Sequence, residues 1–339
     1  MPIRRTCATM ALHRHLAAVD ANYPAVRREI EAFSILARRA PRTTVARINV
    51  VVHVLYRTAA ENISDAQIQS QIDVLNADFR GSNPDIDKVP AAFSGRVGDA
   101  LVEFALATEG PDGRKSTGVT RTRTRVTAFD GDISALDEEI KVTSGAAAWP
   151  AGRYLNLWVC TLGSGLLGYA QFPGGPAERD GVVILNAAFG TSGIVEGPFD
   201  RGRTATHEIG HWLNLLHIWG DDDLGCRGSD SVADTPNQAG SNGGCPQFPS
   251  ISCRNGPLGD MFMNYMDYTD DACMFLFTRG QVSRMHAALA GPRASLVGPE
   301  DDEAGERLLD VQEFRAMAGA QEAEQGERPT LVFDGVDWV

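Results

Sequence analysis

The segment His207–His217, with the sequence HEIGHWLNLLH, constrains the fold of this chain more than any other part. On a helix of 3.6 residues per turn, His207 and His211 lie on one face and can direct ring nitrogens at one metal ion. Glu208 then lies beside that ion without binding it. A catalytic zinc site has three protein ligands and leaves the fourth position to water. The segment therefore predicts a zinc site, with His217 as the third ligand.

His217 can join the other two histidines only if the helix ends before it. In a continuous α-helix His217 would lie roughly 120° from the ligand face, because each residue turns the helix by about 100°. The chain must therefore turn near Leu213 and Asn214. Long zinc motifs usually have glycine here because the backbone is left-handed at this turn. Asparagine tolerates that conformation best among the other residues, so we expect a left-handed turn at Asn214.

A second segment, Asn264–Tyr268 (NYMDY), lies downstream at a distance typical of the methionine turn beneath the metal of metzincin proteases. We expect Met266 to pack beneath the histidines and Tyr268 to direct its hydroxyl toward a substrate carbonyl. The alternative for Met266 is ordinary core packing, the commoner role of methionine. A bare H-E-x-x-H also arises by chance on surface helices. Three of the seven histidines lie within the eleven residues of the first segment, however, and this favours the zinc site.

Several motifs in order resemble the pappalysin family of metzincin zinc metalloproteases, in its ulilysin-like microbial branch. The resemblance extends from about Val45 to about Leu296. It rests on HEIGHWLNLLHIWGD, on D-x-V-x-D-T-P at Asp230 to Pro236, on NYMDYTDDAC and on FTRGQVSRM. The resemblance implies a zinc metalloendopeptidase that hydrolyses peptide bonds with zinc-activated water. It also implies these roles: zinc ligands at His207, His211 and His217, the general base at Glu208, the methionine turn at Met266 and an assisting tyrosine at Tyr268.

The fold class that we expect is α+β, with a metzincin-type catalytic domain. Its upper lobe has a twisted mixed β-sheet with helices, its lower lobe is irregular and disulfide-linked, and the zinc lies in the cleft between them. Apolar runs predict strands over 48–56, 101–107, 154–160 and 181–186. Apolar spacing and capping residues predict helices over 64–79 and 278–289, and a zinc helix that starts near Thr204, capped by its hydroxyl. The predicted domains are a propeptide (1–42), an N-terminal catalytic subdomain (43–213), a C-terminal catalytic subdomain (214–296) and an acidic extension (297–339).

Four of the six cysteines follow the zinc helix, in a segment rich in Gly, Asp, Asn and Pro. Such a segment needs cross-links to hold its loops, so we expect disulfides. Spacing leaves three pairings open, and the family resemblance implies Cys226–Cys253 and Cys245–Cys273. A second zinc site is the alternative, but the chain has no C-x-x-C pair. Cys160 ends an apolar strand and is expected to act as a small buried hydrophobe.

Cys7 lies in the sequence Arg4-Arg5-Thr6-Cys7, ahead of a helical, charged segment from about His13 to Arg39. This part resembles a propeptide. A thiolate is a strong zinc ligand and can take the position of the catalytic water, which would keep the enzyme latent as a zymogen. Cleavage near Arg38 to Arg42 would then release activity. The alternative is an unpaired terminal cysteine with no role.

An acidic, oxygen-rich loop region follows the zinc helix and predicts a structural calcium site. Hard cations take several carboxylate and carbonyl oxygens, and the family resemblance implies calcium near the active site, although no EF-hand spacing is present. A solvated acidic loop is the alternative. The acidic residues are Asp221, Asp222, Asp223, Asp230 and Asp234.

Two further segments bear on the substrate. Asp270 and Asp271 directly follow the methionine turn, and we expect them to line a pocket that favours Arg or Lys after the cut, a preference that the resemblance implies. Leu166–Phe172 is either an edge strand, along which an extended substrate pairs its backbone, or a buried strand. The resemblance favours the edge strand.

The composition agrees with an enzyme that acts outside the cell. The net charge of −13 argues against binding to nucleic acid, and residues 300–339 hold 12 acidic and three basic residues. No apolar run has the length needed to cross a membrane. We expect a secreted monomer that acts on proteins or peptides, although no apolar signal segment follows Met1. The alternatives are a catalytically silent zinc-scaffold binding protein and a disulfide-stabilised adhesion or inhibitor module. Every catalytic position is filled, which favours the protease.

Overall fold

The computed structural model describes residues 4–37, 42–222 and 225–297. Residues 38–41 of the predicted cleavage segment, Asp223, and the acidic extension from residue 298 onward lie outside the described residues. The helices and strands within the described ranges are, in chain order, α1 (Thr9–Val19), α2 (Tyr23–Ala37), β1 (Ala46–Tyr56), α3 (Asp65–Phe79), α4 (Ala91–Ser94), β2 (Val102–Leu106), β3 (Val119–Arg123), α5 (Ile133–Glu138), β4 (Leu155–Cys160), β5 (Gly168–Ala170), β6 (Val182–Leu185), α6 (Arg203–Trp212), β7 (Gly243–Gly244), β8 (Tyr268–Thr269) and α7 (Arg279–Ala290).

The upper lobe is built on one mixed sheet with the order β2-β1-β4-β6-β5. β2 and β3 pair in parallel with successive halves of the long strand β1, so both lie on the same side of it. β4 and β6 continue the parallel sheet, whereas β5 runs antiparallel to β6. Among the described residues β5 has no further named strand beside it, so it is the edge strand that the family resemblance favoured within residues 166–172.

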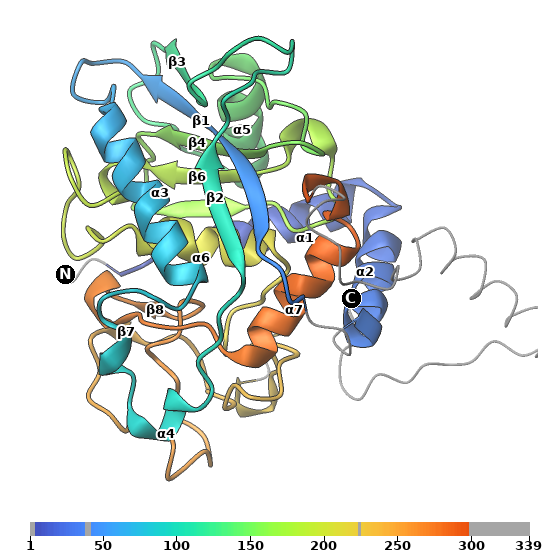
Figure 1. Cartoon of the computed structure of the whole chain (residues 1–339), viewed down its shortest axis with the longest axis vertical. Coiled ribbons are helices and arrows are strands. Elements are labelled where there is room, and N and C mark those ends of the chain that lie inside the picture. The colour runs from blue at the N-terminus through green and yellow to red at the C-terminus, as the bar shows by residue number, and fades with distance from the viewer. Residues whose placement is uncertain (1–3, 38–41, 223–224, 298–339) are drawn as a thin grey trace, which may run out of the picture.

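Helices cover both faces of this sheet (Figure 1). Strands buried on both faces are mostly apolar, and β4 is buried at every position, with Asn156 as its one polar residue. On one face α3 and α6 pack against the sheet through residues such as Leu75 and Ile209. On the other face α1 and α5 pack through Leu12 and Leu136, and Cys160 is buried in that layer as predicted. Each fully buried aliphatic side chain stabilises the fold by about 1.5–3 kcal/mol, so both layers hold the sheet rigid.

The helix boundaries follow local capping rules. Ser64 Oγ accepts the Gln67 amide at 3.1 Å and begins α3, as predicted. A capping box at Thr278 begins α7. The helical N-terminal segment consists of two helices, because the Asp20 carboxylate accepts the Asn22 amide at 2.9 Å and Pro24 lacks an amide donor.

The lower lobe follows α6 and contains little regular structure besides α7. Disulfides join Cys226 to Cys253 and Cys245 to Cys273, the two pairs that the family resemblance implies. The expected α+β class, with a mixed sheet above and a disulfide-linked lobe below, is confirmed.

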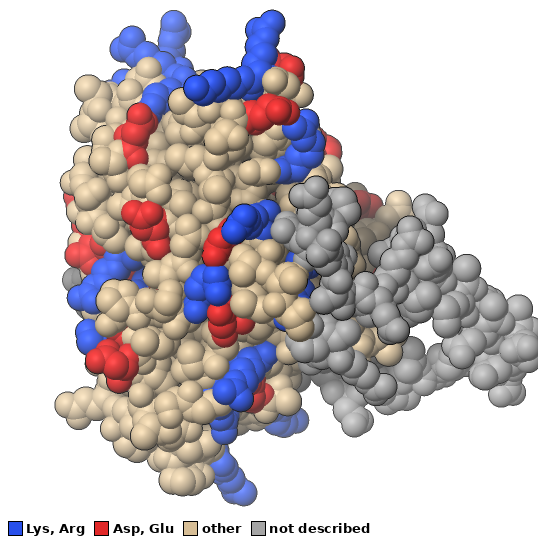
Figure 2. All heavy atoms as spheres, viewed as in Figure 1, with Lys and Arg blue, Asp and Glu red and all other residues tan. Residues whose placement is uncertain are grey.

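The outer surface carries charges of both signs. On the face drawn in Figure 2, basic side chains gather at the end of the molecule where β3 lies, and acidic and basic side chains are interspersed elsewhere. Among the described residues, no helix has the length and apolar character needed to span a membrane.

Candidate active site

Helix α6 carries the first two histidines and is held between the sheet and the lower lobe. The expected cap by Thr204 is wrong, because α6 begins at Arg203 after Gly202 and has no side-chain cap of its own. The cap comes from the lower lobe. Asp271 Oδ2 accepts the amides of Arg201 at 2.8 Å and Arg203 at 3.1 Å. A carboxylate at a helix N-terminus is favoured by the helix dipole, so Asp271 fixes the helix to the lower lobe.

The helix ends at Trp212, and Asn214 follows in the left-handed conformation with φ 74°. The predicted turn is therefore confirmed. It returns the chain so that His217 faces the helix, with its Nε2 3.1 Å from His211 Nε2. All three histidines are buried, and their rings lie within 5.2 Å of one another between centroids.

Each histidine directs its Nε2 at the common centre, because its Nδ1 forms a hydrogen bond with an oxygen atom. His207 Nδ1 lies 2.7 Å from the Tyr265 carbonyl, His211 Nδ1 2.7 Å from the Leu215 carbonyl, and His217 Nδ1 2.6 Å from Asp221 Oδ1. Such outer contacts orient metal-binding histidines and fix their tautomers. His207 Nε2 is buried and has no hydrogen-bond partner among the residues that the structure describes.

The donor set at this centre fits a zinc ion. Within the described residues, Cys7 Sγ and ligand atoms of the three histidines all lie within 4.8 Å of one another. Burial lowers the pKa of His207, and burial with His217 nearby lowers that of His211 to about 3. Both imidazoles are therefore neutral, as a metal ligand must be. Imidazole nitrogens and a cysteine sulfur are ligands that zinc takes, and four donors match its usual coordination number.

Glu208 lies beside the centre and contacts the N-terminal segment. Its Oε2 accepts the Thr9 hydroxyl at 2.9 Å and the Cys7 thiol at 3.3 Å. Burial raises the pKa of Glu208 to about 7, although the hydrogen bonds from Cys7 and Thr9 oppose that rise. A carboxylate with a pKa near neutrality suits proton transfer at neutral pH.

Met266 and Tyr268 lie where the sequence placed them relative to the histidines. Met266 is fully buried beneath α6, and a Cβ added at Gly210 would lie 2.5 Å from its sulfur. The glycine in HEIGH therefore leaves space for Met266. The Tyr268 ring lies 4.9 Å from the His217 ring and 5.7 Å from the His207 ring, on the wall of the site.

The N-terminal segment crosses this site in an extended conformation beside β5. Its amides and carbonyls pair with the edge strand, with Ala8 N 3.1 Å from Gly168 O and Leu167 N 3.2 Å from Thr6 O. Cys7 forms a parallel bridge with Gly168. This pairing brings the Cys7 thiol over the three histidines.

Arg5 is almost fully buried, at 2% exposure, two residues before Cys7. Its guanidinium contacts Asp271 at 2.5 Å, Thr204 Oγ1 at 3.0 Å, the Thr269 carbonyl at 3.3 Å and the Phe199 ring centroid at 4.9 Å. Of the two aspartates predicted to form a specificity pocket, Asp271 therefore contacts a basic side chain directly. Asp270 lies beside it, and burial raises its pKa while Arg5 opposes the rise.

A second contact holds the N-terminal segment behind the active site. Glu31, on α2, accepts Arg284 Nη2 at 2.6 Å and Asn214 Nδ2 at 3.2 Å. Arg284 is fully buried on α7, and its Nε donates to the Asn214 carbonyl at 2.5 Å. Ser34, also on α2, lies 3.3 Å from Asn214 Nδ2. Helix α2 therefore binds the turn at Asn214 that follows the zinc helix.

Three of the aspartates predicted to bind calcium form hydrogen bonds within the protein instead. Both oxygens of Asp221 face His217, where they accept its amide and its ring N–H. Asp230 accepts the Val232 amide and the Thr235 hydroxyl, and Asp234 accepts the Thr278 hydroxyl and the Gly280 amide. The sequence interpretation missed that Asp221 supports His217, although its spacing of four residues from the histidine was the available signal.

Comparisons with known proteins agree with this geometry. The family model described as pregnancy-associated plasma protein-A matches residues 137–290. The chain is 32% identical over 274 residues to an extracellular metalloprotease of Arthroderma otae. This alignment covers 78% of this chain and 86% of that protein. It is 33% identical over 266 residues to an extracellular metalloprotease of Pyricularia oryzae, which covers 75% of this chain and 79% of that protein.

Two solved structures are more similar still. A promirolysin variant of Tannerella forsythia superposes with a TM-score of 0.80 at 46% identity, over 86% of this chain and 97% of that one. Mature mirolysin from the same organism, in complex with a cleaved peptide, gives a TM-score of 0.72 at 52% identity, over 76% of this chain and 97% of that one. The chain therefore belongs to the pappalysin family, in its ulilysin-like branch, and is a metalloendopeptidase.

Proposed function

We propose that this chain is a secreted zinc endopeptidase made as a latent zymogen, in which Arg5 and Cys7 occupy the substrate and zinc sites. The observation that carries this proposal is the convergence of Cys7 Sγ with the three histidines within 4.8 Å. Support for export comes from the relatives named extracellular metalloproteases. The likeness to a promirolysin variant over 86% of this chain, against 76% for mature mirolysin, supports latency.

The residues around the centre would have different roles in catalysis. His207, His211 and His217 would hold the ion, and bound zinc polarises a peptide carbonyl and lowers the pKa of a water molecule to about 7. Once Cys7 and Thr9 have left, Glu208 is free to accept a proton from water and to pass it to the leaving amine. The Tyr268 hydroxyl would donate a hydrogen bond to the developing oxyanion.

Asp271 is the residue that we propose to select a basic side chain after the cut. Its Oδ2 accepts the amides of Arg201 and Arg203 at the start of α6, and its Oδ1 binds the Arg5 guanidinium. In the mature enzyme Oδ1 is left for a substrate arginine or lysine. Charge-assisted pairs of this kind are about twice as strong as neutral hydrogen bonds. Asp270 would add negative potential near the mouth of the same site.

A structural calcium site in the acidic loop remains a prediction, which rests on the family resemblance. Asp221, Asp230 and Asp234 are poor candidates for calcium ligands, because their carboxylates already accept hydrogen bonds from other groups. Protein or peptide substrates and a monomeric state complete the proposal. The complex of mature mirolysin with a cleaved peptide supports the peptide substrate.

A Glu208→Gln variant tests the assignment. Zinc content and cleavage of a quenched peptide with arginine after the scissile bond would be measured before and after limited trypsin treatment. We expect one zinc per chain in both proteins and a loss of turnover of roughly a hundredfold or more in the variant, which is typical for removal of a general base. The control is Glu178→Gln, at an exposed glutamate.

Either of two results would contradict the proposal. Retained cleavage by the Glu208→Gln protein would remove Glu208 from the mechanism. Bound zinc without cleavage by the wild-type protein under any condition would favour a silent zinc-scaffold binding protein.

A further inference from the structure

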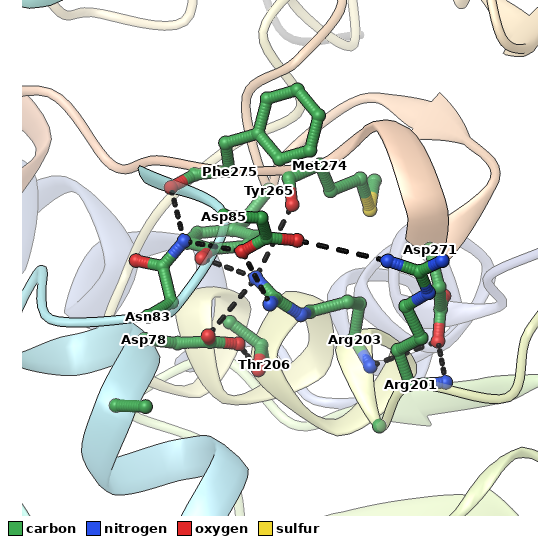
Figure 3. Close-up of polar contacts among 12 residues, drawn as sticks. Asp78, Asn83, Asp85, Arg201, Arg203, Thr206, Tyr265, Asp271, Met274 and Phe275 are labelled. Atoms are coloured by element: carbon green, nitrogen blue, oxygen red, sulfur yellow. Dashed lines mark hydrogen bonds and ion pairs between the residues drawn. The ribbon is translucent and has the colours of Figure 1, made fainter. Parts of the chain in front are cut away.

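A buried ionic cluster lies at the start of the zinc helix, and the proposed mechanism does not use it (Figure 3). Its centre is Arg203, which is 4% exposed. The guanidinium lies 2.9 Å from Asp78 Oδ1 and 3.0 Å from Asp85 Oδ1. These partners come from the end of α3 and from the loop after it, so the cluster joins the upper lobe to the first turn of α6.

The same guanidinium reaches the lower lobe. Arg203 Nη1 donates to the Tyr265 hydroxyl and, at 3.2 Å, to the Met274 carbonyl. Its carbon Cζ also lies 5.1 Å from the centre of the Tyr265 ring. The Tyr265 amide donates to the Leu276 carbonyl at 3.0 Å. Tyr265 is therefore fixed at its hydroxyl, its ring and its backbone, and it is fully buried.

Tyr265 is also the residue that orients the first histidine of the site. Its carbonyl oxygen lies 2.7 Å from His207 Nδ1. An uninterrupted series of contacts thus leads from Arg203 through Tyr265 to His207. The guanidinium is a planar fork that makes several hydrogen bonds in fixed directions, so it gives this series a rigid origin.

We propose that Arg203 is a positioning residue for the metal centre, which acts through Tyr265 on the ring orientation of His207. The inference rests on the proposed zinc site. Asp78 and Asp85 hold the guanidinium from the upper lobe, and Thr206 donates to Asp78 Oδ2 at 2.6 Å from the next turn of α6. A shift of the cluster would move the carbonyl that holds His207 without touching any candidate ligand.

The sharpest test is Tyr265→Phe in the full-length chain. It removes the hydroxyl that Arg203 binds but keeps the ring and the carbonyl that His207 contacts. Loss of an outer contact weakens metal binding by about 10- to 100-fold. Because the Tyr265 carbonyl itself stays, we expect the zinc dissociation constant to rise by about tenfold, the lower end of that range. Competition with a chromophoric chelator measures it, and the absorption spectrum of the cobalt-substituted protein reports the changed ligand geometry.

Tyr154→Phe is the matched control. Tyr154 is also buried, at 2% exposure, and its hydroxyl donates to the Glu109 carbonyl at 3.0 Å, but it packs on the upper lobe with Trp149, away from the histidines. Both variants lose one hydroxyl contact and should lower the melting temperature, Tyr265→Phe more because its hydroxyl binds a charged group. Only Tyr265→Phe should change zinc affinity and the cobalt spectrum.

Arg203→Lys provides a second arm in case Tyr265→Phe does not fold. Lysine keeps the charge between Asp78 and Asp85 but lacks the fork that also reaches Tyr265, so zinc affinity should again fall about tenfold or more. Zinc affinity and a cobalt spectrum equal to wild type in the folded variants would overturn the inference and leave Arg203 a purely structural residue. Failure of the wild-type protein to bind zinc would instead overturn the proposed function.

Discussion

The N-terminal segment contacts the rest of the molecule in two places that differ in chemistry. Residues 5–9 are extended, pair with the edge strand β5 and place Arg5 and Cys7 directly in the active site. Helix α2 lies behind the site, where Glu31 binds the buried Arg284 and the side chain of Asn214. The first contact occupies the groups that would carry out catalysis, whereas the second touches none of the candidate zinc ligands.

The two contacts therefore have different roles: residues 5–9 block the active site, and helix α2 holds the segment in place. A short extended stretch makes few contacts outside the site that it blocks, so it needs a second attachment to stay bound. Helix α2 supplies that attachment through Glu31 and through the packing of Phe33 against Ala287. Cleavage after α2 therefore does not by itself release the segment, because both contacts must also break. With the proposed propeptide of residues 1–42, substitutions in residues 5–37 would leave the sequence of the mature enzyme unchanged, which makes the two contacts separately testable.

The largest effect on latency is expected from Cys7→Ala. Loss of the thiol leaves a position at the metal open to water, so activity should appear much sooner after the purified zymogen is incubated. A shortening of the lag by more than about tenfold corresponds to a contact worth more than about 1.4 kcal/mol. Continuous cleavage of a quenched peptide measures the lag.

The control for Cys7→Ala is Cys160→Ala, which removes the other free cysteine, buried in the layer that α1 and α5 form with the sheet. Equal lags in Cys7→Ala and wild type would mean that the segment blocks the site by its backbone alone. The Cys7 thiol would then have no part in blocking the active site, and the two contacts would not differ in the way proposed above.

Arg5→Ala should have the next largest effect. The substitution leaves Asp271 buried without its cation, and breaking a buried ion pair from one side costs about 3–5 kcal/mol. We expect a shorter lag and a lower melting temperature of the zymogen, and Arg5→Lys should restore part of both. The neighbouring Arg4 is exposed, so Arg4→Ala should change neither. An unchanged lag in Arg5→Ala would show that Cys7 suffices to block the site.

Local signals in the sequence predicted the parts of this arrangement that depend on short-range order. The spacing of His207 and His211, the left-handed turn at Asn214 and the cap at Ser64 all depend on neighbours within a few residues. The contacts of Arg5, Glu31 and Arg203 could not be found this way, because their partners lie far along the chain. The same limit explains the error at Thr204. The cap of α6 is Asp271, which only the folded lower lobe brings to the helix.

Glu31→Gln should weaken the holding contact and have a smaller effect than either substitution at the cleft. The neutral amide keeps the shape of the side chain but leaves Arg284 without a carboxylate among the described residues. A hydrogen bond to a charged group contributes about 1.5–3 kcal/mol, so more of the cleaved segment should dissociate during gel filtration. Arg28→Gln, at an exposed position on the same helix, is the control. A difference in kcat/KM between the mature enzymes from both zymogens would contradict this interpretation.

The pH dependence of segment release gives the smallest and most specific signal. Burial raises the pKa of Glu31, but the Arg284 and Arg27 guanidinium groups outweigh it, so the net pKa is lowered in the docked state. A carboxylate with a lowered pKa stabilises docking above its ordinary pKa of about 4.3, and this contribution is lost as the pH falls through the lowered value. The cleaved segment should therefore be retained at neutral pH and released more readily below about pH 4. Gel filtration of cleaved zymogen over a pH series, with Glu31→Gln alongside, measures this. A variant with the same pH profile as wild type would assign the pH-dependent release to carboxylates other than Glu31.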